Sequence, residues 1–313
     1  MPPNEDLRQR IAAQVTASCD FPDAGRDRLV EQLCSRYGRG LAAILIYGSY
    51  LRGKRDTLLD FYVLLDGYAS LPQRWQVWLV KLLPPNVYQV WDGAPPRETR
   101  AKYALLSLER FESCVRRDFH SYFWARFAQP SGLLYARDEA IRERVIDALA
   151  VAGTTFARRV TPILPDEFGA AELWSGGLEQ TYACEFRSEP PGHASRLYGY
   201  WPDYYAAVTA CLAHADAGFA AAGGQDRYRN TTAASARRRA ALVWRARKVH
   251  GKVLSTLRLV KAAFTFDGAL EYLLWKIHRH SGIYLEPTPR QVRFPLLFAW
   301  PLLWRLWRQG AFR

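Results

Sequence analysis

Cysteine is scarce in this sequence and forms no recognisable framework. The chain of 313 residues has five cysteines, an odd number, and no Cys-x-x-Cys pair. Disulfide-rich folds and zinc sites need paired cysteines at short, regular spacings. The cysteines therefore argue against a disulfide framework and against a zinc site, and they favour a reducing compartment.

Long apolar runs are also lacking. A membrane-spanning helix needs ~20 consecutive apolar residues, and no stretch of the chain reaches that length. The nearest approach, residues 294–307, is interrupted by Pro295 and Pro301 and ended by Arg305 and Arg308. The N-terminus carries Glu5 and Asp6 and has no apolar run, which fits neither a secretory signal nor a transit peptide. We expect any membrane contact to lie on the bilayer surface.

Acidic residues are outnumbered by basic ones. The chain has 43 lysines and arginines against 30 aspartates and glutamates, which gives a formal net charge of +13. This excess predicts an anionic partner, which can be nucleic acid, a nucleotide or an acidic membrane surface. Hydrophobic residues make up 49% of the chain, which is enough to bury at least one sizeable core.

Hydrophobic periodicity predicts an α+β fold. Compact apolar runs indicate buried strands at 41–49 and 58–66, with further strands at 87–91 and 102–107. Helical spacing predicts helices over the ranges 5–17, 27–37, 75–83, 108–127, 138–160, 168–178 and 204–219. All four predicted strands thus lie in roughly the first third of the chain, together with three of the helices, and helices dominate the remainder.

The chain divides into three parts on the same evidence. A small mixed α/β unit occupies residues 1–110, and a mostly helical region follows at 111–222. Small and polar residues from Ala221 to Thr232 form the clearest linker. A basic C-terminal region occupies residues 223–313.

The motif that carries chemistry lies where the first predicted strand ends. Tyr47-Gly48-Ser49 closes the strand, and Asp60 begins the next strand twelve residues after Gly48. Glycine lets a backbone approach a phosphate closely, and N–H groups with a serine hydroxyl donate to it. A carboxylate in an apolar strand costs several kcal/mol unless it is paired or bound to a cation. The alternative is a structural role for Asp60, either capping the turn or pairing with a cation of the following loop.

This arrangement resembles the nucleotidyltransferase superfamily, whose polymerase-beta-like core has a strand, Gly-Ser and then Asp-x-Asp on the neighbouring strand. The second carboxylate position is Tyr62 here, which cannot replace a carboxylate. Asp66 lies six residues from Asp60, about 20 Å along a strand, and cannot share its metal ion. The second ligand must therefore come from elsewhere, or the metal site is depleted.

One branch of the superfamily also lacks the second Asp of this pattern. The mitochondrial-type phosphatidate cytidylyltransferases, also called the translocator assembly and maintenance family of peripheral CDP-diacylglycerol synthases, carry YGS followed by a single Asp. Similar segments occur here in the family's order: IYGSY at 46–50, LDFYVLLD at 59–66, KYALLS at 102–107, SYFWARFAQP at 121–130 and LPDEFGAAELWSGGLEQTYACEFR at 164–187. Ala125 replaces a family glycine, Glu185 replaces a family aspartate, and Arg187 is retained.

The resemblance implies Mg²⁺-dependent transfer of CMP from CTP to phosphatidic acid, which yields CDP-diacylglycerol and pyrophosphate. It also implies a winged-helix-like middle region and the following site residues. Asp60, Lys102 and Glu185 are the expected catalytic residues; Asp60 and Glu185 are the expected metal ligands; Tyr47, Gly48, Ser49, Arg52, Lys54, Arg126 and Arg187 are the expected nucleotide and phosphate contacts. Each of these charged residues also has a structural alternative. Glu185 can form an ion pair with Arg187, Arg126 and Arg187 can each be a structural ion-pair arginine, and Arg52, Lys54 and Lys102 can be solvated charges.

The C-terminal region is basic and amphipathic. Eleven lysines and arginines and no acidic residue lie between Arg227 and Lys261, with apolar residues interleaved at helical spacing. Such a helix is typical of a surface that binds anionic lipid, and nucleic acid is the rival partner. Tryptophans at 275, 300, 304 and 307 favour the membrane, although this segment can also dock on the protein's own core.

We therefore expect a peripheral enzyme on the cytoplasmic face of a bacterial inner membrane. Its partners would be CTP, phosphatidic acid and an anionic membrane surface, with nucleic acid disfavoured. Two other hypotheses stay open: a nucleotidyltransferase that acts on a sugar, an antibiotic or RNA, and a degenerate relative that binds anionic lipid or nucleic acid without catalysis.

Overall fold

The computed structural model describes most of the first 265 residues. Omitted are 1–3, 55–56, 70, 72–73, 94–98, 186–191, 216 and 225, and beyond 265 only residues 288, 301, 304, 305 and 308 are described. The roles predicted for Arg187 and for most of the apolar segment 294–307 therefore lie outside the described residues.

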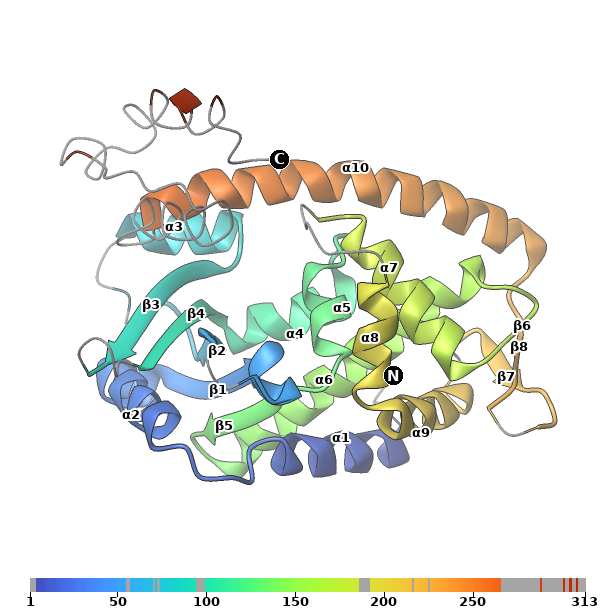
Figure 1. Ribbon diagram of the computed structural model, residues 1–313, viewed down its shortest axis with the longest axis horizontal. Coiled ribbons are helices and arrows are strands. Elements are labelled where there is room, and N and C mark those ends of the chain that lie inside the picture. The colour runs from blue at the N-terminus through green and yellow to red at the C-terminus, as the bar shows by residue number, and fades with distance from the viewer. Residues whose placement is uncertain are drawn as a thin grey trace.

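A mixed five-stranded sheet forms one side of the molecule (Figure 1). Its strands are β1 (Leu41–Tyr47), β2 (Leu59–Leu65), β3 (Asn86–Asp92), β4 (Thr99–Ser107) and β5 (Gly132–Ala136), in the order β3-β4-β2-β1-β5. β2 and β4 are parallel, and the other neighbours are antiparallel. β1 and β2 lie at the centre with both faces covered, which explains their continuous apolar runs. The expected α+β class is confirmed.

Helices cover both faces of the sheet. α2 (Ala24–Tyr37) packs on one face, where the hydroxyls of Tyr37 and Tyr103 lie 3.0 Å apart. α4 (Leu108–Arg117), α5 (Tyr122–Phe127) and α6 (Glu139–Val160) lie on the opposite face, where the ring of Phe127 meets that of Tyr62 at 4.8 Å. α1 (Glu5–Ala17) packs against α6 and β5.

The predicted continuous helix over 108–127 is wrong, because residues 118–121 separate α4 from α5. Asp118 leaves the helical conformation, and its carbonyl oxygen accepts hydrogen bonds from the indole of Trp124 and the guanidinium of Arg159. Side-chain donors thus replace the backbone bonds that a continuous helix would make. Strand β5, which follows α5, was not predicted, because its five residues are too short for a clear alternating pattern.

The second half of the described chain is mostly helical. Its elements are α7 (Gly177–Tyr182), α8 (His193–Gly199), α9 (Pro202–Ala213) and a small sheet of β6 (Glu167–Phe168), β8 (Tyr228–Asn230) and β7 (Phe219–Ala221). The helix predicted over 168–178 is instead β6, a π-helical turn at Glu172–Gly176 and the start of α7. The linker predicted after Ala221 is a β7–β8 hairpin, held where the side chain of Asn230 donates to the carbonyls of Thr161 and Leu164.

The basic C-terminal helix forms as α10 (Ala234–Thr265) and runs along one edge of the molecule (Figure 1). Near its end the ammonium of Lys261 donates to the carbonyls of Leu83 and Pro85, which follow α3 (Arg74–Leu82). α10 thus connects the sheet side of the molecule with the helical side. Among the described residues, no helix has the length and apolarity needed to cross a bilayer.

Candidate functional site

Three of the predicted site residues stand side by side across the sheet. The strand register pairs Tyr47 of β1 with Asp60 of β2, and Asp60 with Lys102 of β4. Residues directly opposite each other on neighbouring strands point to the same face. Twelve residues lie between Tyr47 and Asp60 and forty-one lie between Asp60 and Lys102, yet the sheet places all three in one row.

The glycine of the motif lies against the carboxylate. Gly48 has φ +91°, and a Cβ built on it would lie 3.2 Å from Oδ2 of Asp60. Glycine adopts this conformation readily, whereas other residues are strained in it. A short 3-10 turn, Ser49–Arg52, follows, and the hydroxyls of Ser49 and Thr57 lie 3.2 Å apart across the loop. The loop backbone therefore passes directly beside Asp60.

Asp60 forms an ion pair with Lys102. The ammonium of Lys102 lies 2.8 Å from Oδ1 of Asp60, and both side chains are partly exposed. An exposed lysine beside a carboxylate provides a cation that can move to an incoming phosphate.

Asp60 could hold a magnesium ion as a single protein ligand, with waters and substrate phosphates as the other ligands. Magnesium is commonly held by one or two carboxylates together with waters and substrate phosphates. Asp60, at the rim of an open glycine turn, matches that mode. In the part of the chain that the structure describes, no group of three or more His, Cys, Asp or Glu side chains forms an all-protein metal cage.

Arg126 is held among tyrosines next to this row. Its guanidinium carbon lies 4.9 Å from the ring centre of Tyr47 and 4.1 Å from that of Tyr122, and it donates a 2.8 Å hydrogen bond to the hydroxyl of Tyr62. The position where the superfamily pattern has a second carboxylate is therefore occupied by a fully buried tyrosine that orients an arginine. Burial raises the pKa of Tyr47 to about 12, so its hydroxyl keeps its proton.

The remaining predicted residues lie around this centre. Arg52 points toward α8, where its guanidinium carbon lies 5.6 Å from the ring centre of Tyr200. Lys54 is exposed on the same loop. Glu185 lies just after α7 and contributes to the electrostatic environment of Arg126 and Tyr122. Its role as a second metal ligand stays a prediction.

Two neighbours of Arg126 were missed in the sequence. Tyr122 stands four residues before Arg126, one helical turn away, so the spacing was a usable signal for their contact. Arg258 of α10 also lies over Tyr122, with 4.1 Å between its guanidinium carbon and the ring centre. No pattern along the chain pointed to Arg258, because its position depends on how α10 docks.

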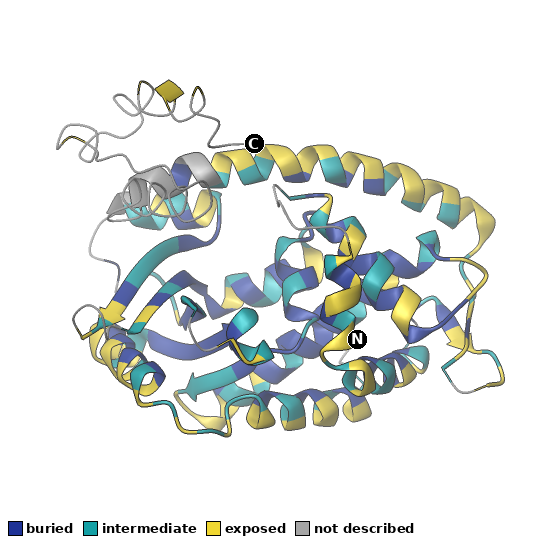
Figure 2. Ribbon diagram, viewed as in Figure 1, coloured by how far each residue is buried: buried dark blue, intermediate teal, exposed yellow. Residues whose placement is uncertain are grey.

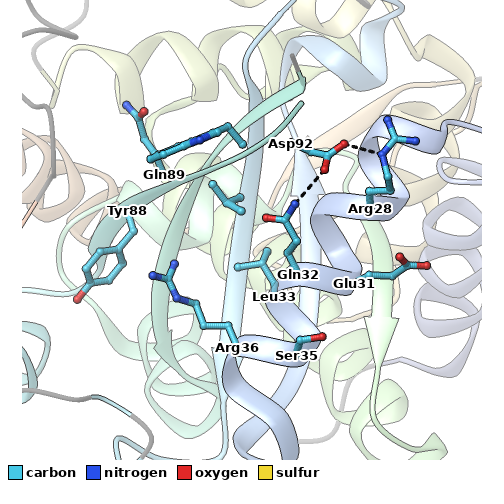
Figure 3. A pocket seen from close by; sticks show the side chains of 11 residues that line it. Arg28, Glu31, Gln32, Leu33, Ser35, Arg36, Tyr88, Gln89 and Asp92 are labelled. Atoms are coloured by element: carbon cyan, nitrogen blue, oxygen red, sulfur yellow. Dashed lines mark hydrogen bonds and ion pairs between the residues drawn. The ribbon is translucent and has the colours of Figure 1, made fainter. Parts of the chain in front are cut away.

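A separate groove lies on the other face of the sheet (Figure 3). It has a volume of about 760 Å³ between α2 and β3, and Tyr88, Arg36 and Asp92 are among its lining residues. Tyr88 pairs in register with Tyr103, which contacts α2, so this groove and the Asp60 site are on opposite faces. Arg28 and Asp92 neutralise each other within the groove at 2.5 Å. It does not open onto the predicted site.

Comparison with known proteins gives no further assignment. No family model matches the chain, and no curated protein matches it. Function is therefore inferred from the residues themselves and from their arrangement.

Proposed function

We propose that the chain is a nucleotidyltransferase that transfers CMP from CTP to phosphatidic acid at a membrane surface. One observation carries the nucleotidyl-transfer part of this proposal. Gly48, in a conformation that favours glycine, brings the turn directly against one carboxylate oxygen of Asp60, and Lys102 pairs with the other oxygen. A glycine turn, one carboxylate and one mobile cation together suit a nucleoside triphosphate. The choice of CTP and phosphatidic acid depends on the motif resemblance.

The proposed reaction needs little acid–base chemistry. A phosphate oxygen of phosphatidic acid attacks the α-phosphorus of CTP, a new P–O bond forms, and the bond to the leaving pyrophosphate breaks. The attacking oxygen is already anionic near neutral pH, so the protein must mainly bring two anions together. Lys102 and Arg126 are placed to offset their repulsion. When bound, a magnesium ion held by Asp60 supplies further neutralisation of phosphate charge.

The outward side of α10 supports the membrane part of the proposal. Leu242, Val249, Val253 and Leu257 are exposed at 64%, 67%, 53% and 49%, and their spacing places them on one side of the helix. Figure 2 shows α10 exposed along this outward side and buried where it faces the body. Exposed cations flank the stripe: Arg238, Arg239, Arg245 and Lys252. An apolar stripe between cations is the pattern of a helix that lies on anionic lipid.

The test is direct transfer of label. Purified protein is mixed with phosphatidic acid vesicles, radiolabelled CTP and Mg²⁺, and we expect a labelled lipid together with released pyrophosphate. Asp60→Asn should reduce turnover on the order of 100-fold or more, since a ligand to phosphate-bound metal contributes several kcal/mol. Asp66→Asn is the matched control, because Asp66 directly follows the same strand and forms an ion pair with Arg137.

Each failure of this assay has a distinct meaning. Transfer to a soluble acceptor without a lipid product would overturn the assignment of phosphatidic acid. No turnover with any acceptor would favour a binding protein without catalysis, and the commitment of Tyr62 to Arg126 is the observation in its favour. Full activity of Asp60→Asn would show that the carboxylate is structural.

A further inference from the structure

Tyr122 is contacted by two arginines from distant parts of the chain. The guanidinium carbons of Arg126 and Arg258 both lie 4.1 Å from its ring centre. Arg126 stands on α5, one turn after Tyr122, whereas Arg258 reaches the ring from α10. All three side chains are only partly buried, so solvent or a ligand can reach them.

In the part of the chain that the structure describes, neither arginine forms an ion pair with a carboxylate, although the charge of Glu185 acts on Arg126. Arg126 donates to the hydroxyl of Tyr62, and Arg258 donates to the carbonyl of Pro84 at 3.2 Å. A second nitrogen of Arg258 lies 3.4 Å from Nδ1 of His120, which is buried. All of these partners are uncharged. Two partly buried cations that share one aromatic ring without a paired anion are costly, and a bound anion removes that cost.

His120 keeps Arg258 in place as a neutral acceptor. Burial, together with the nearby Arg258, lowers the pKa of His120 to about 4, so the ring is uncharged near neutral pH. Its Nδ1 also accepts a 3.2 Å hydrogen bond from the backbone N–H of Tyr122. One neutral ring therefore contacts both the backbone of Tyr122 and the guanidinium of Arg258, which fixes their relative position.

The two arginines belong to a series of side-chain contacts that runs from the Asp60 row to α10. Arg126 lies over Tyr47, the cross-strand neighbour of Asp60, and also over Tyr122. Arg258 lies on the far side of Arg126 from Asp60 along this series of contacts, and it belongs to the helix whose outward side carries the exposed apolar stripe. An acceptor phosphate must meet the nucleotide at the Asp60 row while its lipid tails stay at the membrane. Arg258 lies between the Asp60 row and the membrane-facing side of α10.

We propose that Arg126 and Arg258, held around Tyr122, bind the phosphate monoester of the acceptor lipid, so that α10 contributes directly to the acceptor site. This inference rests on the proposed function, since it assigns the acceptor half of the same site. Arginine suits the task because its planar fork binds two phosphoryl oxygens at once. The Gly48–Ser49 turn and Lys102 are left for the triphosphate. Arg258 thereby links membrane contact on one side of α10 to substrate binding on the other.

The experiment compares Arg258→Gln and Arg258→Lys with Arg10→Gln. Arg10 is exposed on α1, on the opposite side of the molecule from α10 (Figure 1). Dioctanoyl phosphatidic acid is used as a soluble acceptor, so that vesicle binding does not enter the measurement. We expect Arg258→Gln to raise KM for this acceptor by about 10-fold or more, the loss of a charge-assisted hydrogen bond, and to leave KM for CTP within about twofold.

The conservative variant separates binding from mere packing. Arg258→Lys keeps the charge but loses the fork, so we expect an intermediate KM for the acceptor. Thermal unfolding followed by circular dichroism verifies that each variant is folded. Calorimetric titration of the protein with dioctanoyl phosphatidic acid, dioctanoyl phosphatidylcholine and inorganic phosphate adds a readout independent of turnover. Binding that needs both the monoester and Arg258 supports the inference.

The outcomes separate this inference from the proposed function. Turnover with an unchanged acceptor KM in Arg258→Gln would overturn the acceptor site and leave the proposed function intact. A rise in KM for CTP alone would assign Arg258 to the triphosphate and overturn the inference. Phosphatidic acid binding that depends on Arg258, without any transfer, would retain the binding site and refute the proposed function. Neither binding nor transfer would refute both.

Discussion

The two sides of α10 carry the same kinds of residue and have different surroundings. The inward side places Trp244, Arg247 and Lys261 in buried positions, exposed at 3%, 4% and 6%. The outward side leaves Leu242 and Val249 more than half exposed. Both sides are apolar and basic, so composition alone assigns them the same role. Their contacts show that one side holds the fold together while the other is available to a partner.

Specific partners explain the inward side. The indole of Trp244 donates a 2.9 Å hydrogen bond to the carbonyl of Arg159, and the guanidinium of Arg247 lies 4.4 Å from the ring centre of Trp244. Arg247 also donates to the carbonyl of Phe119. Some of the basic residues of α10 therefore contact the protein itself, and only the exposed ones can attract an anionic surface.

The largest expected effect is a loss of stability from a substitution on the inward side of α10, compared with one on the outward side. Trp244→Ala removes a buried aromatic and one hydrogen bond, and we expect it to lower the free energy of unfolding by about 3–5 kcal/mol. Leu242→Ala, two residues away on the outward side, should change it by no more than about 0.5 kcal/mol. Urea unfolding followed by far-ultraviolet circular dichroism measures both. Equal losses would show that the outward side also packs against the protein.

A smaller effect is expected where α10 passes closest to the body. A Cβ on Gly251 would lie 2.2 Å from the carbonyl oxygen of Cys184 and 2.9 Å from Nε2 of His120. Gly251→Ala should therefore lower the free energy of unfolding by about 2–3 kcal/mol. Gly153→Ala within α6 is the matched control, because nothing lies within 4 Å of the added carbon and alanine favours helix. A stabilised Gly251→Ala would mean that α10 docks differently.

The pH dependence should follow His120 on the inward side. The folded pKa of about 4 lies below the ordinary value of 6.5, mainly because of burial, so the unfolded chain binds more protons between these values. Stability is full above the unfolded pKa and falls as the pH drops, by about 2 kcal/mol between pH 7.5 and 5.0. Nearby Arg258 and His250 act in the same direction, and Glu185 opposes them.

His120→Gln tests this origin of the pH dependence. The variant removes the titrating ring, so its unfolding free energy should fall by about 2 kcal/mol less than that of the parent protein over the same pH range. Urea unfolding at a series of pH values gives the comparison. An unchanged slope would assign the acid sensitivity to other groups.

The smallest effect on stability is expected on the outward side. Val249→Ser combined with Val253→Ser should leave the free energy of unfolding within about 0.5 kcal/mol. The same pair should weaken binding to phosphatidic acid vesicles by about 10-fold, since it removes apolar contact worth roughly 1.5 kcal/mol. Vesicle sedimentation provides the measurement, with Ala241→Ser as the matched control on the same helix. Undiminished sedimentation would contradict membrane contact through this stripe.

Much of the local structure follows from the sequence. The apolar runs that end at Tyr47 and begin before Asp60 predicted β1 and β2, because buried central strands need continuous apolar residues. The Gly48–Ser49 turn between them was also recognisable, since a positive φ favours glycine. β5 and the β7–β8 hairpin escaped prediction, because short strands owe their existence to neighbours that lie far away along the chain.

Sequence alone therefore determined the long helices, the central strands and the glycine turn, since these arise mainly from interactions between residues close along the chain. Only the tertiary structure decided which charged groups meet. The register of parallel strands β2 and β4 places Lys102, rather than a nearby loop cation, 2.8 Å from Asp60. The docking of α10 likewise brings Arg258 to Tyr122. Such pairings depend on how whole helices and strands bury their apolar faces against one another, and that packing geometry cannot be predicted from local sequence.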